Sequence, residues 1–327
     1  MNNTIKMLFL LVNFFTTEML SQQPSLPYLR QVEIKCAVRF DPIKKIYFYS
    51  YSVRNGVTSN GEIGSFKIDV SRDSISAVAL DNIGLLFVDI AMENIYKRMY
   101  TEISNSVVPI GFPSLPQYGD GSLSWDGMAV LTGGPFKPGQ ERHGFVMSSK
   151  GLPSIRNFVA VPPFDPYDLY PRIEEVDDPD SLNKVVEKDR EAVKFRGNTI
   201  GPSAPPLNFI PTAWCDTLIS YKHQAVTLGW LRDRREGQKN EDDEEEEDGI
   251  VAKLDKRLDK VRAELVKGDS LKARKELEKF VKKVEKLYKE SKEEEEEDKN
   301  KPEQVVITSE GFALLKYNAE YLIDRLP

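Results

Sequence analysis

The strongest constraint on the fold of this chain is a change in the spacing of its apolar residues near Trp214. Before Trp214, short segments alternate apolar and polar residues, which is the period of a β-strand with one buried face. After Trp214, apolar residues recur every three or four positions, which places them on one stripe of an α-helix. We therefore predict an α+β fold in which a β-rich module precedes a helical module.

The β-rich module is predicted to contain six or seven short strands. They cover residues 32–40, 46–53, 63–70, 78–80, 129–131, 142–148 and 155–161. Asp41-Pro42 and Asn55-Gly56 predict turns, the second with positive φ, so the first three strands are expected to form an antiparallel meander. The pattern favours an antiparallel immunoglobulin-like β-sandwich over residues 22–165.

Two segments of this module have a less regular pattern. Residues 74–105 predict a strand followed by an excursion with helical spacing. Residues 109–126 are rich in glycine and proline, which predicts irregular surface chain.

The second half of the chain predicts a linker and a small helical bundle. Residues 166–211 are a proline-rich linker with a short helix over 181–191 and a hairpin over 195–202. Residues 212–327 then carry four amphipathic stripes, and Gly229 and Gly268 are placed to end the first two helices. Such helices can bury their stripes only against each other, so a four-helix module is expected.

Two acidic tracts account for the negative charge of the chain. Residues 241–248 carry eight acidic side chains and residues 293–298 carry six. The formal net charge of −7 becomes +7 when these fourteen residues are set aside. Like-charge runs repel themselves and have little to bury, so solvated loops are expected over 238–249 and 292–301.

The N-terminal residues have the pattern of a secretory signal peptide. A short polar start with one lysine precedes an apolar run over 7–15, and cleavage is expected near Ser21. The alternative is a buried amphipathic N-terminal helix. No later stretch reaches 18 apolar residues, so no stable membrane span is expected after cleavage of residues 1–21. We expect an extracytoplasmic location, which is periplasmic, cell-surface or secreted.

The chain has two cysteines, Cys36 and Cys215, each within an apolar pattern. Two buried thiols are the preferred interpretation, because a small hydrophobe is expected at both positions. An oxidising compartment would permit a Cys36–Cys215 disulfide instead. Two sulfurs alone do not build a zinc site, so no metal is expected.

No catalytic residue or cofactor is predicted. The two histidines, His143 and His223, are expected to have structural roles, and the chain has no metalloprotease, nucleophile-elbow or P-loop motif. Tyr118, Trp125 and Asp126 are candidate binding residues for a sugar or a protein, although Trp125 alternatively fills the sandwich core. Nucleic acid is excluded as a partner, because no basic cluster alternates with aromatics and the acidic tracts repel phosphate.

Residues 212–327 resemble a known family of helical modules. The resemblance rests on residues 216–223, on Leu228-Gly229-Trp230, on the helices that flank Gly268-Asp269, and above all on residues 313–323. These are similar to the FIMAH domain found at the C-terminal end of many secreted bacterial proteins. The acidic tracts and Cys215 depart from that family. The resemblance implies a fold and an extracytoplasmic setting, but no activity.

Four short segments upstream extend the resemblance. Residues 122–125, 138–140, 144–145 and 151–155 resemble uncharacterised exported bacterial β-sandwich proteins. Together these features predict an exported, non-enzymatic interaction or structural protein of the bacterial envelope or exterior, with a protein or glycan partner. The alternative is a carbohydrate-binding module or a weak glycan hydrolase, since pairs of carboxylates are brought together only by folding.

Overall fold

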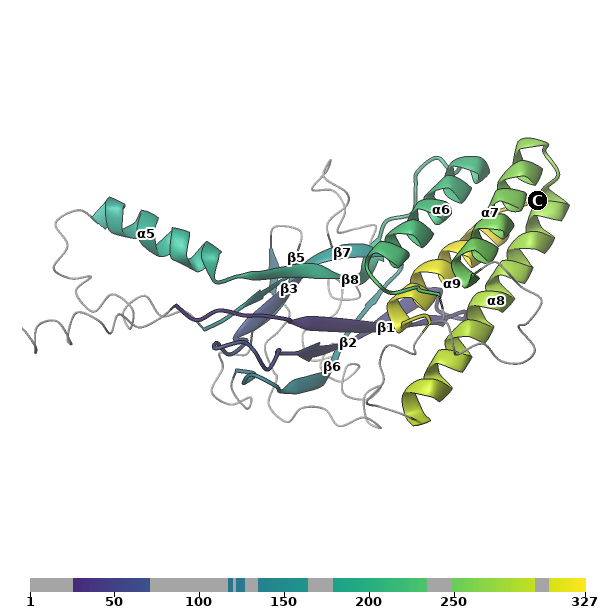
Figure 1. Cartoon of the computed structure of the whole chain (residues 1–327). Helices are drawn as coiled ribbons and strands as arrows, with labels where there is room; N and C mark the ends of the chain where they lie inside the picture. The colour runs from purple at the N-terminus through teal and green to yellow at the C-terminus, as the bar shows by residue number, and fades with distance from the viewer. Residues whose placement is uncertain are drawn as a thin grey trace, which may run out of the picture.

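The computed structural model of the chain describes residues 26–70, 117–119, 122–126, 135–163, 179–233, 249–297 and 306–327. Within these residues the protein is a mixed α/β structure with two antiparallel sheets and five helices (Figure 1). Four sequence predictions lie outside the described residues. They are the signal peptide predicted over 1–21, the excursion predicted over 74–105, the strand predicted at 129–131 and the acidic loop predicted around 241–248. No helix of the described part is long and apolar enough to cross a membrane.

The smaller sheet has three strands in the order β1-β2-β6. Its strands are β1 (Glu33–Asp41), β2 (Ile46–Arg54) and β6 (Glu141–Ser149). The predicted period of two is confirmed in β2, where Tyr49 and Tyr51 are buried while Ser50 between them is exposed. This sheet therefore has one apolar face toward the core and one polar face directed outward.

The larger sheet has five strands in the order β4-β5-β3-β7-β8. Its strands are β4 (Gln117–Gly119), β5 (Ser122–Asp126), β3 (Ser65–Asp69), β7 (Leu152–Val161) and β8 (Phe195–Ser203). The prediction of irregular chain over 109–126 is wrong for β4 and β5. These two strands pair with each other, and β5 also pairs with β3.

The hairpin predicted over 195–202 is also wrong, because β8 is a single strand that pairs with β7 along its whole length. Gly197 is needed there for space and not for a turn. A Cβ atom at Gly197 would lie 2.6 Å from the ring of Phe158, its partner on β7.

The predicted meander of the first three strands is wrong as well, because β3 belongs to the other sheet. Asn55 is buried, and its side-chain amide donates to the carbonyl oxygens of Gly61 and Phe136 at 2.9 and 3.0 Å. Gly56 does not have positive φ. It is required because a Cβ atom would lie 2.1 Å from the carbonyl oxygen of Arg30. Asn55 and Gly56 therefore stabilise the segment in which the chain passes from the three-stranded sheet to the five-stranded sheet.

Buried tyrosines connect the two sheets. The hydroxyl of Tyr49 donates to the carbonyl oxygen of Gly151 at 2.8 Å, and that of Tyr51 donates to the carbonyl oxygen of Ile200 at 3.0 Å. A buried hydroxyl without a partner costs about 1–3 kcal/mol, so these bonds are a condition for burying the phenol rings.

Four helices gather at one end of the sheets, and α5 (Pro179–Ala192) lies at the opposite end of β8 (Figure 1). The four are α6 (Pro211–Thr227), α7 (Ile250–Val266), α8 (Ser270–Glu297) and α9 (Ser309–Ile323). Gly229 and Gly268 follow α6 and α7 with φ of 71° and 78°, which confirms the predicted helix ends.

The acidic loop predicted over 292–301 is wrong for its first residues, because α8 continues through Glu297. The acidic residues at the end of α8 follow a lysine-rich stretch, so ion pairs between lysine and glutamate form along the helix. Lys289 lies 3.7 Å from Glu293, one turn later.

Helix α9 is buried between the other helices and the sheets. Ten of its fifteen residues are buried, and it packs against β1, β7 and β8 as well as α6 and α8. Asn318 donates to the carbonyl oxygen of Pro153 on β7 at 2.8 Å, and its own carbonyl accepts the indole N–H of Trp214 at 3.0 Å. The expectation that the helices bury their stripes only against each other is therefore wrong for α9. Sheets and helices share one apolar cluster.

The outer edge of β1 is covered by side chains from two other elements. Thr199 of β8 donates to the carbonyl oxygen of Ile34 at 3.0 Å. On α9, Glu310 accepts the N–H of Cys36 at 2.6 Å, and the hydroxyl of Tyr317 donates to a β1 carbonyl oxygen at 3.1 Å. An uncovered edge strand offers these groups to another chain, so this arrangement closes the edge.

Replacing Thr199 with valine tests this edge. Thr199→Val keeps the shape of the side chain but leaves the buried carbonyl oxygen of Ile34 without its donor. We expect the free energy of unfolding to fall by about 1–3 kcal/mol in urea denaturation. Thr227→Val is the matched control, because Thr227 is exposed on α6 and bonds within its own helix. An equal effect of the two substitutions would contradict the role of Thr199.

A buried lysine joins α6 to α7. Lys222 is 1% exposed and its ammonium group pairs with Asp255, whose side chain is 34% exposed. A second pair between the same helices, Arg262 and Asp216 at 2.6 Å, is about half exposed on both sides. Removing one partner of a buried ion pair leaves an uncompensated buried charge and destabilises the fold. Exposed ion pairs contribute little to the free energy of unfolding.

Comparing Asp255→Asn with Asp216→Asn measures this difference. We expect Asp255→Asn to cost about 2–3 kcal/mol of stability, below the range for fully buried pairs because Asp255 is partly solvated. Asp216→Asn should cost less than about 1 kcal/mol. Urea denaturation of both variants would refute the burial argument if the two costs were the same.

Candidate functional site

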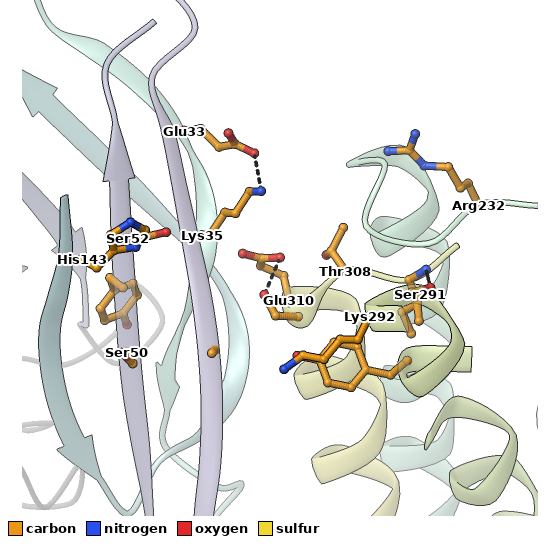
Figure 2. Close-up of a pocket in the computed structure, with 15 residues that line it drawn as sticks. Glu33, Lys35, Ser50, Ser52, His143, Arg232, Ser291, Lys292, Thr308 and Glu310 are labelled. Atoms are coloured by element: carbon orange, nitrogen blue, oxygen red, sulfur yellow. Dashed lines mark hydrogen bonds and ion pairs between the residues drawn. The ribbon is translucent and has the colours of Figure 1, made fainter. Parts of the chain in front are cut away.

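A cavity of about 400 Å³ lies between the outward face of the three-stranded sheet and the helices α8 and α9 (Figure 2). Its floor is formed by Lys35 and Ala37 of β1, Ser50 and Ser52 of β2, and His143 of β6. The strand register places them together, because Ser52 lies opposite both Lys35 and His143, and Ala37 lies opposite Ser50. Small and polar residues therefore line one continuous area of the sheet.

The wall of the cavity comes from the helical part of the chain. It includes Tyr288, Ser291 and Lys292 of α8, Arg232 after α6, and residues 308–310 at the start of α9. The hydroxyl of Ser291 accepts the N–H groups of Val306 and Ile307, both at 3.1 Å, so α8 holds the segment that leads into α9.

The ring of Tyr288 stacks on Phe312 of α9, with centroids 4.1 Å apart. These contacts make the wall a pre-formed part of the fold.

Glu310 is the buried acidic group of this wall. Its side chain is 4% exposed, and burial raises the pKa of its carboxyl. One oxygen accepts the N–H of Cys36, and the other accepts the hydroxyl of Ser309 at 3.3 Å. Figure 2 shows Glu310 directed from α9 toward β1. Its carboxyl therefore holds the first turn of α9 against the edge of the sheet.

Basic groups outnumber acidic groups in the cavity. The cavity is lined by four basic residues and two acidic residues. The basic ones are Lys35, His143, Arg232 and Lys292, and the acidic ones are Glu33 and Glu310. Lys35 lies 3.8 Å from Glu33, so their charges offset each other in part. Lys292 lies 5.3 Å from the centre of the Tyr288 ring, and Arg232 donates to the uncharged carbonyl oxygen of Gly229. The helical wall is thus the more positive side of the cavity.

The candidate binding residues from the sequence lie in the other sheet. Tyr118 is in β4, and Trp125 and Asp126 are in β5, where Trp125 lies opposite Phe66 of β3. The strands bring the three residues close along the ladder, and the placement of their side chains lies outside the described part of the structure. The cavity is lined by other residues.

The two cysteines are free and buried in separate surroundings. The thiol of Cys36 lies 3.9 Å from the carbonyl oxygen of Ala37, and that of Cys215 lies 3.9 Å from the carbonyl oxygen of Leu258. Burial, together with the charge of Glu310, raises the pKa of Cys36, and burial raises the pKa of Cys215 to about 12. Both sulfurs are therefore held as neutral thiols, and the structure has no bridge between them.

The two histidines are exposed. His143 lies in the floor of the cavity with its Nε2 3.7 Å from Glu141, and His223 lies on α6 with its Nε2 3.4 Å from Asp255. Among the described residues, no group of three histidine, cysteine, aspartate or glutamate side chains is arranged to hold a metal ion.

The polar floor of the cavity could be predicted in part from the sequence. Ser50 and Ser52 are small polar residues on alternate positions of a strand, and this marks an outward face without bulky side chains. Arg232 follows α6, whereas Lys292 lies in α8 and Glu310 lies in α9. No local spacing in the sequence relates these three residues to β2.

The sequence matches no protein-family model and no curated protein. The resemblance of residues 212–327 to the FIMAH domain therefore rests on the residues that carry it and remains a proposal.

The buried carboxyl of Glu310 predicts a specific pH dependence. Its pKa in the folded state is raised above the ordinary value of 4.5, so the folded state holds the proton more tightly than the unfolded state. The stabilisation is complete below pH 4.5 and is lost as the pH rises through the folded-state pKa. We expect wild type to lose stability relative to Glu310→Gln as the pH rises above about 4.5.

Urea denaturation at several pH values measures this difference. Glu278→Gln is the control, since Glu278 is exposed on α8 and does not line the cavity. Parallel pH profiles for wild type and Glu310→Gln would show that burial does not control the protonation of Glu310.

Proposed function

We propose that the chain is an exported, non-enzymatic binding protein of a bacterial envelope or exterior, and that the cavity beside β1 is its ligand site. The observation that carries this proposal is the convergence of polar side chains from both sheet and helices on one space of about 400 Å³. Small-molecule sites typically occupy about 300–1,000 Å³ and orient their ligand with a few convergent polar groups.

The compartment and the finer fold are part of this proposal. The apolar run over 7–15 supports export, and the FIMAH-like residues support an extracytoplasmic setting. Two antiparallel sheets joined by buried tyrosines support an immunoglobulin-like β-sandwich, and α6 to α9 at one end support a small helical bundle.

The chemistry of the reactive groups favours binding over catalysis. Cys36 is buried next to the charge of Glu310, which disfavours the thiolate that a nucleophile requires. The carboxyl oxygens of Glu310 accept hydrogen bonds from Cys36 and Ser309 and thereby hold α9 to β1. These groups contribute to the fold rather than to a reaction.

A weak glycan hydrolase is the second candidate, because two carboxyl groups in different surroundings line the cavity. Glu33 is about half exposed, whereas Glu310 is buried and its pKa is raised. Glycosidases use such a pair as base or nucleophile and as acid. Release of reducing ends from a glycan that stops in both Glu33→Gln and Glu310→Gln would favour this candidate over binding alone.

Blocking the cavity tests the binding proposal. Ala37 is exposed on the cavity floor, and Ala37→Trp fills the space with a residue that strands accommodate well. On arrays of glycans and peptides, we expect at least tenfold weaker binding of each ligand that wild type retains. Ala263→Trp, at an exposed position of α7, should bind as wild type does.

Trp125→Ala on the same arrays tests the site expected from the sequence. Ligands that are lost with Trp125→Ala and retained with Ala37→Trp would move the site from the cavity to the β4–β5 ladder. That result would contradict the cavity as the binding site.

A further inference from the structure

We infer that the cavity beside β1 binds an acidic saccharide, with sugar hydroxyls over the serine floor and separate anionic groups toward Lys292 and toward Arg232. This inference rests on the proposed function and specifies its ligand. It follows from the charge, the hydrogen-bonding groups and the size of the cavity.

The charge of the wall selects an anionic group. Lys292 and Arg232 come from different elements and lie on the helical side of the cavity, across from Lys35 on β1 (Figure 2). Glu33 offsets Lys35 at 3.8 Å, and the carboxyl of Glu310 is already occupied by the N–H of Cys36. Acidic groups of a ligand beside Lys292 and beside Arg232, at the two ends of the helical wall, therefore complete the charge balance, and charge-assisted hydrogen bonds are the stronger kind.

The floor of the cavity selects a ligand with hydroxyl groups. Ser50 and Ser52 occupy alternate outward positions of β2, which places them roughly 7 Å apart along the strand. Each hydroxyl both donates and accepts, as sugar hydroxyls do. Ala37 beside them leaves room for a ring to approach the sheet.

Other anionic ligands fit this cavity less well. An inorganic anion alone fills little of about 400 Å³ and uses none of the serine floor. A nucleotide base binds by stacking on an aromatic face. The ring of Tyr288 already stacks on Phe312 at 4.1 Å, and Lys292 lies 5.3 Å from its centre. Hydroxyl groups and one or more negative charges are thus the chemistry that the cavity matches.

Isothermal titration calorimetry on the whole chain tests this inference. The probes are a galacturonate oligosaccharide, the neutral galactose oligosaccharide of the same length, a sulfated galactose oligosaccharide and inorganic phosphate. We expect the acidic saccharides to bind at least tenfold more tightly than the neutral one, and the affinity to fall as salt is added. The galacturonate and sulfated arms distinguish a carboxylate ligand from a sulfate ligand.

Charge variants identify the residues responsible. Lys292→Gln and Arg232→Gln should each weaken the binding of the acidic saccharide about tenfold, and should leave the neutral one unchanged. Lys289→Gln is the matched control, because Lys289 is an exposed lysine of α8 that pairs with Glu293 and does not line the cavity. Circular dichroism and thermal unfolding confirm that each variant folds.

The outcomes separate this inference from the proposed function. Equal binding of acidic and neutral saccharides, or phosphate binding as tightly as the saccharides, overturns the inference. No binding of any acidic saccharide also overturns it, while array ligands that are lost in Ala37→Trp still support the cavity as a site. Acidic saccharide binding that persists in Ala37→Trp overturns both.

Discussion

The contact between helix α9 and the edge of strand β1 is the interaction on which the rest of the structure depends. Glu310 and Tyr317 bond to backbone groups of β1, and Asn318 bonds to the carbonyl oxygen of Pro153 on β7. These side chains are buried, and each makes at least one hydrogen bond to the sheets, which offsets part of the cost of removing it from water. Their pairing fixes the position of α9 against the sheets, and the apolar cluster extends without interruption from strands to helices.

The cavity is a consequence of that contact. Helix α9 is held at the edge of β1, and Ser291 of α8 binds the segment that leads into α9. The two helices therefore form a wall beside the polar face of the three-stranded sheet. Ala37, Ser50 and Ser52 are too small to fill the space between floor and wall. A site built in this way is organised before a ligand arrives, which lowers the entropic cost of binding.

The same residues explain why we assign this site to binding. Glu310 and Cys36 are the groups that most resemble catalytic ones, yet both are buried in the contact that joins helix to sheet. The positive groups Lys292 and Arg232 instead lie at the helical wall and bond to no carboxylate in the described part of the structure. In the proposed function, the buried groups of the cavity have structural roles and its exposed groups have the recognition role.

The sequence by itself determined several of the local elements. The period of two predicted β1 and β2, and Gly229 and Gly268 marked the ends of α6 and α7, because these features depend on neighbouring residues and on backbone conformation. Only the tertiary structure decided that β3 joins the second sheet, that β8 is one strand, and that α9 packs on β1. Cys36 and Glu310 are 274 residues apart in the chain, and a contact of that separation follows from packing the whole core, which leaves no trace in local spacing.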